Sequence, residues 1–198
     1  MRNFWTLLLC CAWSPMGVLA QNTDQGARAA ATSVPPVEIS VSYSSLRANQ
    51  GPGQCGCFNM NGGSTEIAFH PYHWFSAVAD LTGEHSGSVN GGGQGLSLIS
   101  YTAGPRFIYS IHDRYELFAQ ALFGGAHGFD TYFPVASGTI GASNSFAMLT
   151  GGGLDIRVKP YLAIRPVQAD YFLTHLPNGV NNRQNNLRLS AGLVFRLW

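Results

Sequence analysis

The sequence predicts an all-β fold, a closed antiparallel eight-stranded up-and-down transmembrane β-barrel. First, stretches of about 10 residues alternate between apolar and polar side chains, the period-two pattern of strands that cross a membrane. Second, the connections between these stretches are alternately long and short, as in membrane barrels with long outer loops and tight inner turns. Third, charged residues occupy the polar face of the strands and are absent from the centre of the apolar face.

Residues 1–20 have the pattern of a secretory signal peptide. Arg2 provides the positive start, a short apolar run follows, and small residues end the segment at Ala20. The run is too short for a transmembrane helix, which needs about 20 apolar residues. Residues 21–36 are polar and end in two prolines, which predicts a periplasmic linker. Residues 37–198 are expected to form the β-barrel domain.

Each expected strand is recognised by an apolar set on one parity and polar residues on the other. In the first four strands the apolar sets are Val37, Ile39, Val41 and Tyr43; Thr65, Ile67 and Phe69; Phe75, Ala77, Ala79 and Leu81; and Tyr101, Ala103 and Phe107. In the last four they are Leu117, Ala119, Ala121 and Phe123; Phe146, Met148, Thr150 and Leu154; part of the stretch 162–173; and Leu187, Leu189, Ala191, Leu193, Phe195 and Leu197.

The connections between the strands set the orientation. The expected long loops are 49–63, 82–95, 124–144 and 174–184, and the short turns are 70–73, 110–114 and 157–161. Short turns follow strands two, four and six, so both ends of the barrel domain are expected on the periplasmic side.

Two prolines are expected to disturb the strands. Pro105 should lie at a bulge or near the end of the fourth strand, because proline has no N–H for the ladder. In the seventh strand Arg165 lies on one parity, and Gln168 and Asp170 lie on the other. A bulge around Pro166 would turn all three side chains inward.

The last stretch, 187–198, is a strand with one apolar face and one largely polar face. An uncovered strand of this kind would recruit other chains, so we expect it to pair with the first strand and close the sheet.

The polar faces hold charges of both signs, which in a membrane barrel must point inward. An eight-stranded barrel is just wide enough for side chains to fill it, and a buried charge is tolerated when it is paired. We therefore expect a plugged interior with a charge network rather than a conducting pore, and a small porin-like channel is the alternative. The expected members are Glu38, Glu66, Asp80, Arg106, Glu116, Asp155, Asp170, Arg188 and Arg196.

The overall charge excludes one class of partner. The chain has 11 Lys and Arg and 10 Asp and Glu, and loss of Arg2 with the signal peptide leaves 10 of each sign. So small a net charge is not typical of a nucleic-acid binder or of a disordered tail.

Cys55 and Cys57 lie in the first long loop, and in an oxidising compartment they could form a loop disulfide. Free thiols and intermolecular pairing remain alternatives, and metal binding is disfavoured because no further Cys or His lies near this pair in sequence. We expect no cofactor and no metal.

Several stretches resemble the small eight-stranded outer-membrane barrels of the OmpA/OmpX-like group, especially single-domain barrels of the acidobacterial type. They are residues 55–63, 104–107, 151–156, 168–171, 177–187 and the terminal strand. The resemblance implies a location in the outer membrane, contact with its lipid, and assembly by the insertion machinery that reads a final aromatic residue. Trp198 supplies that residue, although on the parity of Arg196. We expect a structural or surface-interaction role, with an unknown extracellular ligand at the loops and no nucleic acid.

An enzyme that modifies lipid A is the main alternative, because eight-stranded barrels of the lipid A deacylase type use a Ser, a His and an acid at the outer surface. Two candidate sets can be drawn from the loops: His127 with Asp130, and His85 with Ser86 and Glu84. Neither has a fixed spacing, so we expect no enzymatic activity. A secreted lipocalin-like binding protein is a third reading.

Overall fold

The computed structural model describes residues 36–49, 57–89, 93–112 and 114–198. The predicted signal peptide, nearly all of the predicted linker, and Cys55 lie outside the described residues. Within those residues no helix is long and apolar enough to cross a membrane.

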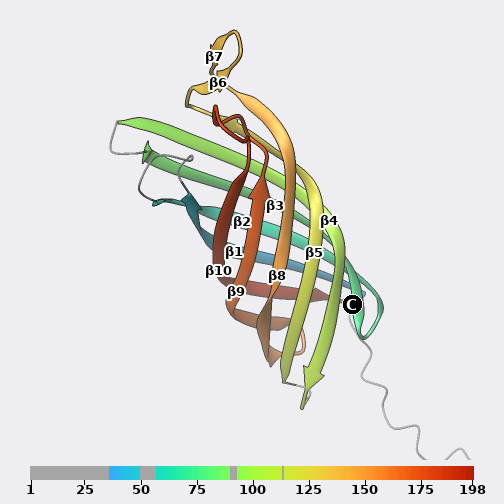
Figure 1. The fold of residues 1–198 in the computed structure, drawn as a ribbon. Coiled ribbons are helices and arrows are strands. Elements are labelled where there is room, and N and C mark those ends of the chain that lie inside the picture. The colour runs from blue at the N-terminus through green and yellow to red at the C-terminus, as the bar shows by residue number, and fades with distance from the viewer. Residues whose placement is uncertain (1–35, 50–56, 90–92, 113) are drawn as a thin grey trace, which may run out of the picture. The chain divides into compact units, whose positions relative to one another are not determined.

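Eight strands form a closed antiparallel barrel in the order β1-β10-β9-β8-β5-β4-β3-β2 (Figure 1). They are β1 (Val37–Asn49), β2 (Cys57–Tyr72), β3 (Phe75–Val89), β4 (Gln94–Ile111), β5 (Tyr115–Phe129), β8 (Ser143–Lys159), β9 (Leu162–Thr174) and β10 (Gln184–Leu197). A separate two-stranded sheet, β6 (Phe133–Val135) and β7 (Gly138–Ile140), lies in the connection from β5 to β8. The predicted fold class is confirmed.

The sheet closes where the sequence predicted, between the first and last strands. β1 pairs with β10 from Val37 opposite Leu197 to Arg47 opposite Leu187, and it pairs with β2 on its other side. Closure leaves none of the eight strands with an unpaired edge, which is what a spanning sheet requires in hydrocarbon.

The strands are longer than the alternation predicted, so the expected loop boundaries were wrong. β2 begins at Cys57, inside the expected first loop, and β3 runs on to Val89. The segments that looked like loops because they are rich in Gly and Ser continue the backbone ladder beyond the apolar band. Gly62 suits this position, since a Cβ there would overlap the backbone of Gly83 on β3.

The side chains sort by face as expected. Glu66, Arg106 and Arg188 point inward and are 3%, 3% and 1% exposed, whereas Leu117 and Leu189 point outward and are 43% and 47% exposed. A soluble barrel would show the opposite arrangement. The outer face therefore suits lipid.

Aromatic residues gather at the end of the barrel that carries the short turns. Trp74 stacks on Tyr72 and on Phe107, with ring centroids 5.7 and 6.2 Å apart. Tyr115 and Tyr161 are also exposed near these turns. Amphipathic rings at this level are typical of a membrane interface.

The predicted bulge in β9 is present. Gln168 pairs with Ser190 of β10 and Arg165 pairs with Gly192, so three steps on β9 match two on β10. Arg165, Gln168 and Asp170 are consequently all buried inside the barrel.

The prediction for Pro105 was wrong. The register of β4 against β5 is the same on either side of it, from Ala103 opposite Phe123 to Arg106 opposite Gln120. Pro105 instead lies within β4 and still pairs with Ala77 of β3 on the other side.

Candidate functional site: the filled interior of the barrel

The centre of the interior is organised by Glu66 on β2. Its Oε2 accepts hydrogen bonds from Arg106 on β4 over 2.6 Å and from Arg165 on β9 over 2.5 Å. Ser40 and Gln168 also donate to this carboxylate, each over 3.2 Å. One carboxylate thus joins two guanidinium groups, of which Arg106 is 40 residues and Arg165 is 99 residues away in sequence.

Arg165 and Arg106 are held by further partners. Arg165 binds Asp155 through two hydrogen bonds of 2.7 and 2.9 Å, and it donates to Gln168 over 2.8 Å. The guanidinium carbons of Arg106 and Arg165 lie 4.3 and 4.5 Å from the centroid of the Phe118 ring. These cation–π contacts fix both side chains over a single aromatic ring.

A second cluster surrounds Arg188 on β10. It pairs with Asp80 over 3.1 Å and with Asp170 over 3.2 Å, and it donates to the hydroxyl of Thr82 over 2.6 Å. Gln120 donates to Asp170 over 3.2 Å and accepts from Arg106 over 2.9 Å. The two clusters are therefore one continuous network.

A third cluster lies at the short-turn end. Arg196 pairs with Glu38 over 2.9 Å and also with Glu116, which pairs with Arg157 over 2.7 Å. Arg157 is the most exposed member, with 28% of its side chain accessible.

The structure brings all nine expected charged residues into these three clusters. The sequence predicted that Arg165 and Gln168 point inward, but it did not indicate that these two residues and Gln120 hold the network together. With Arg165 and Arg157 included, the ion pairs join six carboxylates and five guanidinium groups. Charge is thus nearly balanced within these ion pairs, as a buried network requires.

An apolar layer that the sequence analysis missed fills the interior toward the long-loop end. Leu46, Leu122, Leu149 and Phe172 are at most 1% exposed and belong to one cluster. Phe133 of β6 and Leu176, from the connection between β9 and β10, join the cluster. Both pack beside Gly128, where a Cβ would lie 2.6 Å from Cζ of Phe133 and 3.4 Å from Cδ1 of Leu176. The interior therefore has an ionic layer and an apolar layer.

The two candidate sets for enzyme chemistry are not assembled as the sequence suggested. Glu84 and Ser86 are buried on the inward face, whereas His85 lies outward and exposed between them. Strand alternation makes this separation unavoidable. Nδ1 of His127 lies 2.7 Å from Oδ1 of Asn144, and Oδ2 of Asp130 accepts from Ser97.

Cys57 is exposed, and its thiol donates to Oδ1 of Asn49 over 3.5 Å. A disulfide with Cys55 stays a prediction, since Cys55 lies outside the described residues. Over the part of the chain that the structure describes, no group of three or more His, Cys, Asp or Glu residues is placed to hold a metal ion.

Comparison with solved structures agrees with this geometry. The Neisserial surface protein NspA superposes with a TM-score of 0.66 at 12% identity, covering 82% of this chain and 97% of NspA. The chain has the fold of the small outer-membrane β-barrels. The attachment invasion locus protein Ail of Yersinia pestis gives 0.55 at 19% identity, covering 82% of this chain and all of Ail. OprG of Pseudomonas aeruginosa gives 0.51 at 6% identity, covering 83% and 96%.

No protein-family model matches the sequence, and a search of curated proteins found no match. The similarity is therefore one of fold. The outward apolar band, the buried charges and the fold shared with outer-membrane barrels all agree with the predicted location in an outer membrane.

Proposed function

We propose that this barrel has a structural or surface-interaction role in the outer membrane and that its interior does not conduct ions. The observation that carries the proposal is the filled interior. An ion moving along the axis would have to displace Arg165, which is 1% exposed and bonded to Glu66, Asp155 and Gln168. It would also have to pass the apolar cluster around Leu122 and Phe172.

The energetic cost of opening supports a closed state. Separating one member of a buried ion pair from its partner costs about 3–5 kcal/mol, and Arg165 has two carboxylate partners. A conducting state would therefore be rare even if the apolar layer moved aside.

Single-channel recording in planar bilayers tests the proposal. The full-length barrel should give no sustained open current under conditions where the bilayer contains many inserted copies. Long open events with a fixed conductance would contradict it and favour the alternative, a small porin-like channel.

The surface-interaction part of the proposal concerns the long-loop end. Ail has been crystallised with the heparin analogue sucrose octasulfate, so a barrel of this fold has taken an extracellular ligand. In this chain the loop after β9 is locally ordered, because Oδ1 of Asn178 accepts hydrogen bonds from the N–H groups of Val180, Asn181 and Asn182. Ordered loops on a rigid scaffold are typical binding elements. Outer-membrane lipid and the barrel insertion machinery are the other partners we infer.

A further inference from the structure

A patch of hydrogen-bond donors lies on the outer wall of the barrel at its long-loop end, across the neighbouring strands β2, β1, β10 and β9 (Figure 1). Asn59 on β2 is opposite Arg47 on β1, and Leu187 on β10 is the partner of Arg47 on the other side. Asn185 is two residues from Leu187, so it is a diagonal neighbour of Arg47, about 7–8 Å away. Arg47, Asn59 and Asn185 are all exposed. One guanidinium group and two amide groups therefore share a small area of surface.

Hydrogen bonds within the patch engage the amide oxygens and leave the amide N–H groups available. Arg47 donates to Oδ1 of Asn59 over 3.4 Å, and the hydroxyl of Tyr171 on β9 donates to Oδ1 of Asn185 over 2.5 Å. Within the described residues, neither amide nitrogen has an acceptor of its own. Because an arginine side chain can only donate, the patch as a whole offers donors rather than acceptors. Such a surface suits an anion.

The charge around the patch favours an anion as well. The described parts of β1, β2, β9 and β10 carry three carboxylates, and all three are buried inside the barrel: Glu38, Glu66 and Asp170. Arg183, directly before β10, adds a second exposed guanidinium group at the same end. On these four strands, an anion beside Arg47 would therefore meet no described carboxylate on the outer wall.

The patch lies at the depth of the headgroups of the outer leaflet. Val37 occupies the same face of β1 at the short-turn end, where it is opposite Phe69. A tilted strand crosses the hydrocarbon in about 9–11 residues, which is the separation of Arg47 from Val37. An arginine on the outer wall is tolerated near the interface but not at the bilayer centre. Arg47 is thus placed where phosphate groups of outer-leaflet lipids would lie.

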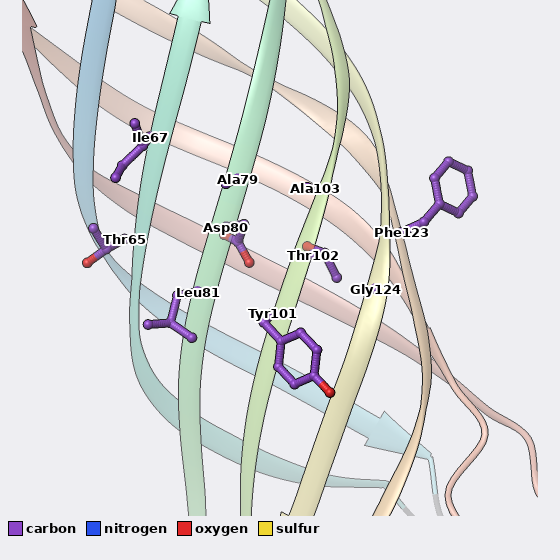
Figure 2. A pocket seen from close by; sticks show the side chains of 10 residues that line it. All are labelled: Thr65, Ile67, Ala79, Asp80, Leu81, Tyr101, Thr102, Ala103, Phe123 and Gly124. Atoms are coloured by element: carbon purple, nitrogen blue, oxygen red, sulfur yellow. The ribbon is translucent and has the colours of Figure 1, made fainter.

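The outer wall also carries an apolar groove closer to the bilayer centre, formed by β2, β3, β4 and β5 (Figure 2). It has a volume of ≈ 480 Å³; Ala79 and Ala103 line it together with the larger side chains of Leu81, Tyr101 and Phe123. This lining suits a hydrocarbon chain and includes no Lys or Arg. The patch around Arg47, and not the groove, is therefore the feature that can distinguish one headgroup from another.

We propose that Arg47, Asn59 and Asn185 bind a phosphorylated sugar of a glycolipid in the outer leaflet. The guanidinium group holds the phosphate through charge-assisted hydrogen bonds, for which its planar fork of donors is suited. The two amide groups donate to the remaining phosphate oxygens or to the sugar. The site deepens the surface-interaction role proposed above and rests on it for the membrane location, but it does not depend on a closed interior.

Native mass spectrometry of the full-length barrel in detergent micelles counts bound lipid molecules and measures their affinity. The probes are lipid A with two phosphate groups, the same lipid A after enzymatic removal of both phosphates, and inorganic phosphate. The wild type should bind one molecule of the phosphorylated lipid at least about 10-fold more tightly than the dephosphorylated lipid, as one charge-assisted hydrogen bond would provide. Inorganic phosphate at the same concentration should not displace it.

Three variants assign the binding to the patch. Arg47→Gln should weaken binding of the phosphorylated lipid about 10- to 100-fold and leave binding of the dephosphorylated lipid unchanged. Arg114→Gln is the matched control, because Arg114 is an exposed arginine at the short-turn end, and it should change neither affinity. Ala103→Leu fills the groove and should leave the preference for the phosphorylated lipid intact.

Three results would overturn the proposal. The first is a loss of binding in Arg47→Gln no larger than in Arg114→Gln, which would indicate only general attraction to cations. The second is equal affinity for the two forms of the lipid, which would mean that acyl chains alone are held. The third is displacement by inorganic phosphate at equal concentration, which would indicate a site for free anions. Heat-modifiable migration in gels checks that each variant is folded, and bilayer recording of the same preparation tests the closed interior separately.

Discussion

Glu66→Gln is the substitution that most directly probes the ionic layer. It keeps the shape of the side chain but removes the charge that joins Arg106 and Arg165 over 2.6 and 2.5 Å. The amide oxygen can still accept from one guanidinium group, whereas the amide nitrogen can only donate. Both arginines would remain over the Phe118 ring with less compensating charge. Breaking a buried pair in this way costs about 3–5 kcal/mol.

The matched control is Glu84→Gln. Glu84 is 5% exposed, close to the 3% of Glu66, but its carboxylate is bonded to the hydroxyl of Ser44 over 2.6 Å, and no arginine among the described residues bonds to it. An amide oxygen can accept that bond, so the expected loss is about 1 kcal/mol, the net worth of one hydrogen bond.

Denaturant unfolding of both variants in phospholipid vesicles, followed by the fluorescence of Trp74 and Trp198, measures the difference. A gap of about 3 kcal/mol corresponds to roughly a 100-fold change in the unfolding equilibrium constant. If Glu66→Gln is no less stable than Glu84→Gln, the interior charges are not held by mutual pairing, and the reasoning about a plugged interior fails.

Two further predictions concern the outer face and the bulge. Leu193→Arg, in the middle of the outward apolar run of β10, should cost about 2–4 kcal/mol in the same unfolding assay, whereas Tyr161→Arg in a short turn should cost about 0–1 kcal/mol; equal costs would contradict the assigned membrane depth. Deletion of Pro166 removes the extra residue of β9 and leaves Arg165 two positions before Gln168, so regular alternation should keep both side chains inside and the variant should still fold into vesicles with the migration of the folded barrel in gels. Failure of this variant to fold would mean that the bulge does more than compensate for one extra residue between Arg165 and Gln168.

The faces of the strands were predictable because side chains alternate with a period of two, whatever the register. The inward position of Arg165 was predictable only by assuming a bulge, since its parity disagrees with that of Gln168 and Asp170. The strand ends were not predictable from sequence. Beyond the membrane, backbone pairing continues only where the neighbouring strand extends as far. Gly62 illustrates this, as it reads as loop in sequence but packs against Gly83 in a strand.

Features that depend on register or on loop packing lay beyond the sequence. Arg47 meets Asn59 and Asn185 only because β2, β1 and β10 are aligned as they are, and nothing in the spacing of these residues indicates it. Phe133 and Leu176 join the apolar layer from connections that have no periodic pattern. The interior charges were predictable because charged side chains must be kept away from lipid. The apolar layer was not, because no comparable rule places its residues inside the barrel.

Methyl NMR of the folded barrel in lipid nanodiscs, with a paramagnetic group on the acyl chains, tests the central claim most directly. The outward methyl groups of Val41 and Ile164, which are 53% and 42% exposed, should be strongly broadened by the lipid-borne spin label. Those of Val78, Leu122 and Val194, at most 3% exposed inside the barrel, should keep sharp signals. The reverse pattern, or equal broadening of both sets, would contradict a barrel whose apolar side chains face the lipid and whose charges lie within.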